Sequence, residues 1–146
     1  MSKTPIPMDQ AVLALTSRRL AAIVREVGMP PRGGVIHCFT GDAAAAREFL
    51  ALGFHISFSG ILTFKSAATL REAAPIVPAE RLLAETDAPY LAPEPYRGKR
   101  NEPAFVARTF EVLAHLRDCD RDVMAAHLDE WMKYWDANIR NRGTRQ

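Results

Sequence analysis

Three short apolar segments, separated by stretches with helical periodicity, most constrain what this chain can fold into. The apolar segments are residues 35–39, 54–58 and 81–85. Residues 43–52 and 66–74, which lie between them, are rich in alanine and leucine and have the spacing of amphipathic helices. Strands that alternate with helices in this way form right-handed βαβ units and build a parallel sheet. The sequence therefore predicts an α/β fold with three parallel strands.

Further helices are predicted on both sides of this unit. Residues 9–27, 103–117 and 120–137 each repeat apolar side chains at helical spacing. Residues 88–103 contain four prolines and several charges, which indicates a long functional loop. The length of 146 residues fits one domain, and no linker divides the chain, so we expect a single domain over residues 1–146.

The charge and cysteine content narrow the class of protein. The formal net charge is +2, which is too small an excess to indicate a nucleic-acid partner by itself. Cys38 and Cys119 form no CxxC pair, so neither a disulfide framework nor a zinc knuckle is indicated, and Cys38 is expected to be a small buried hydrophobe. The sequence has no stretch of about 20 apolar residues and no signal-peptide core. We therefore expect a cytoplasmic protein without a membrane partner.

Two of the predicted strands end in side chains that can bind a metal or move a proton. His37 lies where the first strand gives way to a loop and is either a metal ligand or general base in a strand-end pocket, or a histidine hydrogen-bonded inside the core. Asp87 follows the third segment and is either a ligand that also accepts a proton, or a cap for the turn into Pro89. If the strand continues, Glu85 shares a face with Asp87 and could orient a ligand.

Small polar and basic residues near the same strand ends are candidates for binding substrate phosphate. Thr40 precedes a predicted helix, whose N-terminal N–H groups favour anions. Lys65, Arg97 and Lys99 could neutralise phosphate charge, and Asn101 belongs to the same basic loop. The alternative is a set of ordinary strand–helix turns and a solvated loop.

Four segments, in this order, resemble the TatD-like metal-dependent deoxyribonucleases. They are His-Cys-Phe-Thr-Gly at residues 37–41, residues 54–64, Glu-Thr-Asp-Ala-Pro-Tyr-Leu-Ala-Pro at residues 85–93 and Arg-Gly-Lys-Arg-Asn-Glu-Pro at residues 97–103. The resemblance covers about residues 20–117, and four ordered motifs are far more specific than one. The resemblance implies a (β/α)₈ barrel fold. It also implies an enzyme that uses one or two divalent metals, such as Mg²⁺, Mn²⁺ or Zn²⁺, to hydrolyse phosphodiester bonds in DNA.

The resemblance also implies roles for individual residues. By that resemblance, His37 and Asp87 are metal ligands, and Asp87 is also the proton acceptor. Glu85 lies beside them, and the loop over residues 97–103 lies near the DNA substrate.

This sequence departs from the family pattern in its N-terminal part. A complete member has a His-x-His pair on its first strand, a glutamate ligand near the fourth and a histidine on the fifth, whereas no histidine precedes His37 here. A barrel of this kind needs roughly 200 residues or more. We therefore expect a C-terminal fragment with the last three βα units of the barrel and a divergent helical tail over residues 120–146.

Three hypotheses for function follow from that expectation. The chain is a nuclease that needs a complementing half-barrel or a homo-oligomer, a non-catalytic remnant that binds nucleic acid or a protein partner, or a truncated product with no folded role. A catalytic metal normally takes about three protein ligands, so the ligand pair in this chain is expected to hold a divalent metal weakly.

Overall fold

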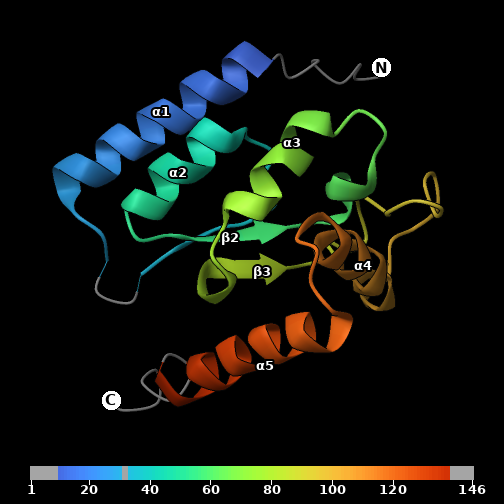
Figure 1. Ribbon diagram of the computed structural model, residues 1–146. Helices are drawn as coiled ribbons and strands as arrows, with labels where there is room; N and C mark the ends of the chain where they lie inside the picture. Colours follow the sequence, from blue (N-terminus) through green and yellow to red (C-terminus); the bar gives the residue numbers. More distant parts are fainter. Residues whose placement is uncertain (1–9, 31–32, 139–146) are drawn as a thin grey trace.

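The computed structural model describes residues 10–30 and 33–138, which form three parallel strands with helices packed around them (Figure 1). The strand order in the sheet is β1-β2-β3 and both pairings are parallel, so the predicted α/β fold with three parallel strands is confirmed. Residues 139–146 of the predicted tail lie outside the described residues. In chain order the elements are α1 (Gln10–Val27), β1 (Val35–Ile36), α2 (Ala43–Ala51), β2 (His55–Phe58), the 3₁₀ helix η1 (Gly60–Thr63), α3 (Ala68–Ala73), the 3₁₀ helices η2 (Ala74–Ile76) and η3 (Ala79–Arg81), β3 (Leu82–Ala84), the 3₁₀ helix η4 (Pro103–Phe105), α4 (Val106–Leu116) and α5 (Arg121–Asn138).

The middle strand, β2, is buried on both faces. Its residue Ile56 lies opposite Ile36 of β1 and Leu82 of β3. Successive side chains of a strand point to opposite faces, and Ile56, Ser57 and Phe58 are all buried. A strand covered on both faces has a nearly continuous apolar sequence rather than an alternating one, which is the pattern found here.

Both outer strands are shorter than the sequence predicted. β1 stops at Ile36 and β3 at Ala84, whereas strands were expected as far as residues 39 and 85. The backbone then turns through left-handed conformations, with φ of 47° at Cys38 and 60° at Asp87. Side chains other than glycine rarely adopt such values, because the Cβ atom crowds a neighbouring carbonyl. The strand therefore does not reach Glu85 and Asp87, and the two carboxylates do not share a strand face.

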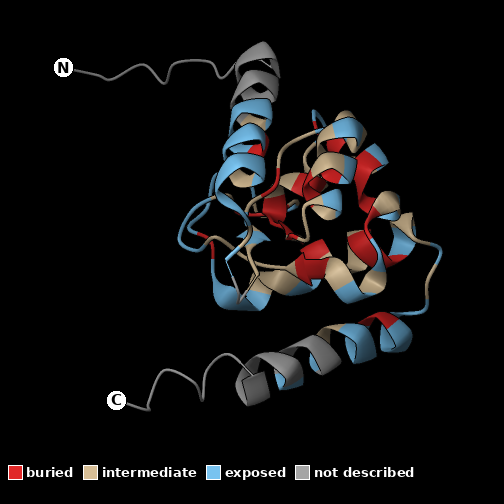
Figure 2. Cartoon of the chain, turned by 90° about the vertical axis from the view of Figure 1, so that its left-hand side faces the viewer, coloured by how far each residue is buried: buried red, intermediate tan, exposed pale blue. Residues whose placement is uncertain are grey.

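Helices enclose the core on either side of the strands. α2 buries Ala46 and Phe49, and α4 buries Leu113 and Ala114. Figure 2 shows the buried residues gathered where these helices meet the sheet, with exposed residues on the outer surfaces. The helix predicted over residues 66–74 is shorter than expected, because α3 passes into η2 at Pro75, which has no N–H group with which to continue an α-helix.

Helix α1 has apolar side chains on two faces, and only one of these faces is covered. Ala21 is fully buried where α1 packs on α2, and Val24 is partly buried against the core. A second stripe is exposed to solvent; it consists of Leu20 at 41%, Ile23 at 47% and Val27 at 74% exposure. Among the described residues, no helix combines the length and apolar character needed to cross a membrane.

The loop that follows β3 packs tightly on the turn that follows β2. The Thr63 hydroxyl accepts a hydrogen bond from the Glu94 N–H, with a nitrogen–oxygen distance of 2.8 Å. Gly60 lies directly against the Leu91 carbonyl oxygen and the Pro93 ring, and a Cβ at this position would overlap the oxygen. The long loop predicted from its prolines is therefore a packed part of the fold.

Replacing Gly60 by alanine should strain this contact. We expect the free energy of unfolding of Gly60→Ala to fall by about 3 kcal/mol or more, because the added methyl group meets backbone atoms that cannot rotate away. Gly98→Ala is the matched control, since it adds a methyl group at φ 82° in open space and should cost roughly 1 kcal/mol. Urea denaturation measures both values, and equal losses in the two variants would contradict the close packing at Gly60.

Candidate active site at the carboxyl ends of the strands

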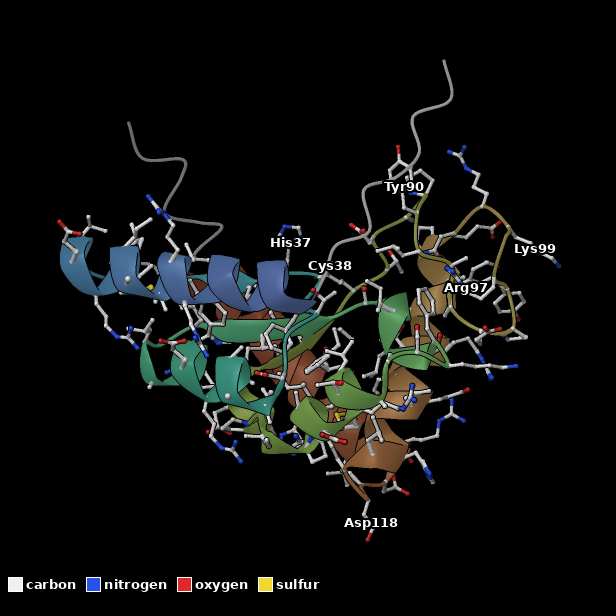
Figure 3. All side chains as sticks on the ribbon, turned by 90° about the horizontal axis from the view of Figure 1, so that it is seen from above. His37, Cys38, Tyr90, Arg97, Lys99 and Asp118 are labelled. Atoms are coloured by element: carbon white, nitrogen blue, oxygen red, sulfur yellow. The ribbon has the colours of Figure 1, made fainter. Side chains whose placement is uncertain are left out.

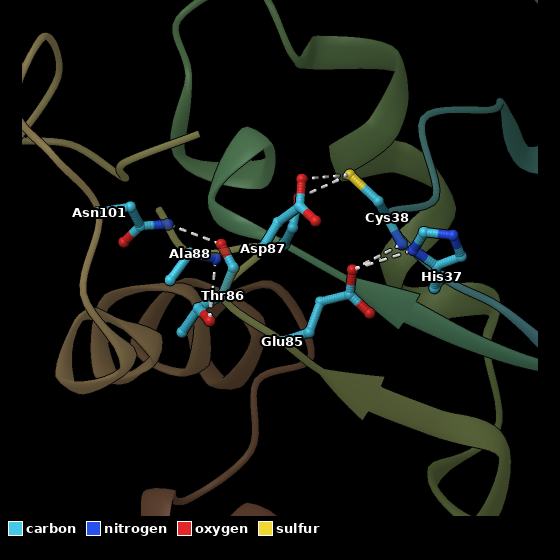
Figure 4. Close-up of polar contacts among 8 residues, drawn as sticks. His37, Cys38, Glu85, Thr86, Asp87, Ala88 and Asn101 are labelled. Carbon is cyan, nitrogen blue, oxygen red and sulfur yellow. Dashed lines mark hydrogen bonds and ion pairs between the residues drawn. The ribbon is translucent and has the colours of Figure 1, made fainter. Parts of the chain in front are cut away.

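The carboxyl ends of the three strands bring polar side chains together at one edge of the sheet (Figure 4). His37 and Cys38 follow β1, Ser59 follows β2, and Glu85 and Asp87 follow β3. In parallel α/β folds this edge is where loops from several strands meet and build a site. The structure thus places the predicted residues His37, Glu85 and Asp87 at a shared edge.

The Glu85 carboxylate connects the ends of the two outer strands. Its Oε1 accepts a hydrogen bond of 2.8 Å from the Cys38 N–H and lies 3.8 Å from His37 Nδ1. Since β1 and β3 each pair with β2 and not with one another, this contact spans the central strand. Glu85 therefore connects the backbone after β1 to the end of β3.

The Cys38 thiol lies between the other two strand ends. Its Sγ is 3.3 Å from Ser59 Oγ and 3.9 Å from Asp87 Oδ2. Burial raises the pKa of the Cys38 thiol, the hydrogen bond with Ser59 opposes this, and the Asp87 and Glu85 carboxylates raise it further by charge repulsion. The thiol therefore remains protonated at neutral pH and can donate toward Asp87.

Sequence reasoning treated Cys38 only as a small buried hydrophobe, so its polar contacts were missed. The side chain is half-buried and contacts residues that lie 21 and 49 positions further along the chain. The one available signal was its place beside His37 at the end of a strand.

Four described residues other than glycine have a left-handed backbone, and two of them, Cys38 and Asp87, belong to this cluster. Holding a residue other than glycine in such a conformation costs of order 1–3 kcal/mol, and such residues gather at functional sites. The strained backbone directs the Cys38 and Asp87 side chains toward one another. The observation supports a functional role for this edge of the sheet.

The His37 imidazole projects into solvent. Its side chain is 78% exposed, and Figure 3 shows it directed away from the body of the fold. The alternative interpretation of His37 as a hydrogen-bonded core histidine is therefore wrong. An exposed imidazole beside a carboxylate remains accessible to a ligand.

Asn101, expected to contact substrate, has its side chain engaged inside the loop. It is buried, and its Nδ2 donates to the carbonyl oxygens of Thr86, at 2.6 Å, and Tyr90, at 2.5 Å. Its Oδ1 accepts from the Glu102 N–H at 2.9 Å. In the structure, Asn101 fixes the backbone on both sides of Asp87 rather than presenting its amide to solvent.

The remaining phosphate-binding candidates lie around the site at different depths. Thr40 is half-buried beyond the end of β1, and Lys65 and Lys99 are exposed. The Arg97 guanidinium stacks over the Phe64 ring, 3.8 Å from the ring centre. Figure 3 shows Arg97 and Lys99 on the loop at the right-hand end of the molecule, His37 and Cys38 nearer its middle, and Asp118 at the lower edge.

The donor atoms at this edge suit a divalent metal in type. Imidazole nitrogen and carboxylate oxygen are ligands that Zn²⁺ and Mn²⁺ accept, and carboxylate oxygen also suits Mg²⁺. Within residues 10–30 and 33–138, no group of three or more His, Cys, Asp or Glu side chains is arranged to hold a metal ion. His37 and Asp87 contribute donor atoms of these types to the edge.

Comparison with known proteins identifies the class to which this fold and site belong. Residues 13–134 match the family described as TatD related DNase, and the chain belongs to that family. The chain is 56% identical over 96 residues to the metal-dependent hydrolase YcfH of Escherichia coli K12. The aligned region covers 66% of this chain and 36% of YcfH. It is also 43% identical over 107 residues to the metal-dependent hydrolase YabD of Bacillus subtilis. That alignment covers 73% of this chain and 42% of YabD.

Solved structures show the same fold. The TatD homologue YJJV of Escherichia coli K12 matches with a TM-score of 0.74 and 35% identity, over 79% of this chain and 44% of YJJV. A TatD family hydrolase from Entamoeba histolytica matches with a TM-score of 0.67 at 19% identity, over 82% of this chain and 46% of that protein, and shows the fold alone. The chain therefore spans less than half the length of these relatives.

Removing the Asn101 amide should loosen the loop that holds Asp87. In Asn101→Ala, two backbone carbonyls lose the buried amide that donates to them, so we expect the free energy of unfolding to fall by about 1–3 kcal/mol. Lys99→Ala, on the same loop but exposed, should change it by about 0.5 kcal/mol at most. Urea denaturation measures both, and an Asn101→Ala variant as stable as Lys99→Ala would contradict the bracing role of Asn101.

Proposed function

We propose that this chain supplies one part of the active site of a metal-dependent hydrolase that cleaves phosphodiester bonds in DNA. The observation that carries the proposal is the convergence of His37, Glu85 and Asp87 at the carboxyl edge of the sheet. The name of the family, TatD related DNase, supports DNA as the substrate.

His37 and Asp87 would hold the metal, with further ligands from outside the described residues. A divalent metal, when bound, supplies Lewis-acid chemistry for the attack of water on phosphorus. The Glu85 carboxylate keeps the Cys38 backbone in place and lies within reach of the His37 ring, so it would restrict how His37 turns.

Asp87 would serve as the proton acceptor. In hydrolysis, water adds its oxygen to phosphorus, the ester P–O bond breaks, and the attacking water gives up a proton to a nearby base. The Asp87 carboxylate contacts the protonated Cys38 thiol at 3.9 Å, and its backbone is braced by Asn101 through Thr86 and Tyr90. Lys65, Arg97 and Lys99 would attract the phosphate groups of the strand.

The proposal predicts cleavage that depends on both a metal and Asp87. With Mg²⁺, Mn²⁺ or Zn²⁺ added, and with the complementary segment described below, we expect a labelled DNA strand to be shortened and a chelator to stop the reaction. Asp87→Asn should lower the rate by at least about 100-fold, because the amide cannot accept the proton. Asp118→Asn is the matched control, since Asp118 also has a left-handed backbone but lies at the opposite edge of the molecule.

Two outcomes would contradict this function. If Asp87→Asn and Asp118→Asn cleave equally well, Asp87 is not the proton acceptor. If no metal supports turnover while the chain binds DNA in a salt-sensitive way, the chain is a nucleic-acid-binding protein and not a hydrolase.

We also propose that a complementing half-barrel docks against α1 and β1. Within the described residues β1 is an outer strand of the sheet and pairs on one side only, and its residue Val35 is exposed. The apolar stripe Leu20, Ile23 and Val27 of α1 lies open as well. An unpaired strand edge and an uncovered apolar helix face are suited to receive one further parallel βα unit. The match covers less than half of each of these relatives, which supports a TatD-type segment as the occupant.

Mixing experiments test this docking surface. The part of YcfH that this chain does not match, expressed separately, should form a one-to-one complex with the chain in size-exclusion chromatography with light scattering. Ile23→Glu should prevent it, because a charge would be buried in the interface, whereas Val123→Glu on α5 should not. A homodimer that Ile23→Glu dissociates, or no complex at all, would overturn the proposal of a complementing half-barrel.

A further inference from the structure

Tyr90 presents a large aromatic side chain to solvent three residues after Asp87. It is 71% exposed, whereas the phenylalanines at positions 39, 49, 54 and 58 are buried in the core. The ring therefore contributes little to the packing of the fold. Figure 3 shows it at the tip of the loop, on the same side of the molecule as His37.

The backbone beneath this ring is held from both sides. The Tyr90 N–H donates to the Asp87 carbonyl oxygen at 2.9 Å, and the Tyr90 carbonyl oxygen accepts from Asn101 Nδ2 at 2.5 Å. The Asn101 N–H in turn donates to the Pro89 carbonyl oxygen at 3.0 Å. An exposed aromatic ring on a braced turn is a preorganised contact surface, because little backbone freedom is lost when it binds.

Positive charge lies close to the same turn. The Asn101 N–H bonds to the Pro89 carbonyl oxygen, so the part of the loop that ends in Arg100 meets the chain at the residue before Tyr90. Lys99 and Arg97 follow on the same loop, and Arg97 is steadied by its stacking on Phe64. An exposed aromatic ring next to cations is the arrangement by which proteins hold a single nucleic-acid strand, with a base on the ring and phosphates on the charges.

We propose that Tyr90 stacks on a nucleobase of the nucleic-acid strand, next to the phosphate that faces Asp87. This inference rests on the proposed function for the site, and it assigns to Tyr90 the positioning of the substrate strand. Stacking uses the face that every base has, so it tolerates any sequence but requires a base that is free of its neighbour on that side. Lys99 and Arg100 contact the flanking phosphates and act without regard to the base.

A binding experiment without metal separates this inference from catalysis. The purified chain is titrated into a short fluorescein-labelled oligothymidylate in the presence of a chelator, and affinity is read from fluorescence anisotropy. We expect Tyr90→Ala to weaken binding about 5-fold to 100-fold and Tyr90→Phe to retain it, because phenylalanine keeps the stacking ring.

The same titration with an oligonucleotide of abasic sites tests the base itself. On that strand Tyr90→Ala and the unaltered chain should bind equally, because no base is left to stack. Lys99→Ala should weaken binding to both strands by the same factor, since it contacts phosphate. This comparison does not depend on whether Tyr90→Ala alters the loop, because a structural defect would weaken both strands alike.

The outcomes distinguish this inference from the proposed function. Equal losses on the two strands, no loss on either, or no binding of the oligothymidylate would overturn the role of Tyr90. Base-dependent binding together with no metal-dependent cleavage would uphold Tyr90 and refute hydrolysis. Metal-dependent cleavage together with binding that does not depend on the base would uphold hydrolysis and refute the role of Tyr90.

Discussion

The hydrogen bond from the Cys38 N–H to Glu85 Oε1 joins the ends of two strands that do not touch within the sheet. β2 separates β1 from β3, so their carboxyl ends need a contact above the central strand to hold a fixed spacing. A hydrogen bond to a charged carboxylate is about twice as strong as a neutral one and suits this task. The left-handed backbone at Cys38 aims the N–H toward Glu85, and the placement of His37 depends on the same turn.

A second set of contacts holds the Asp87 side of the site. Asn101 bonds to the backbone before and after Asp87, and the loop beyond it packs on Gly60 and Thr63 at the end of β2. Contacts from one strand end to another therefore hold all three in place. Together these contacts offset the conformational free energy of the strained backbone at Cys38 and Asp87. The same bracing leaves Tyr90 exposed and places it beside the basic residues of the loop.

Local sequence patterns predicted the three strands and their parallel arrangement, and pointed to His37, Glu85 and Asp87 as candidates. The apolar segments are short and separated by helices, and the acidic and imidazole groups follow them directly. The same patterns did not reveal that the strands end at Ile36 and Ala84, because the turns there depend on contacts between distant residues. The Cys38–Glu85 and Cys38–Asp87 contacts join positions 47 and 49 residues apart, and the internal role of Asn101 depends on a loop folded back on itself.

Hydrogen exchange at the Cys38 amide tests most directly whether the strand ends are tied together as described. In the unaltered chain this amide should be protected, although it lies beyond the end of β1. Glu85→Ala should speed its exchange by about 10-fold or more, while the Ile56 amide in the central strand should change much less. If the Cys38 amide exchanges at the same rate in both proteins, Glu85 does not join β1 to β3, and the proposed arrangement of the site is wrong.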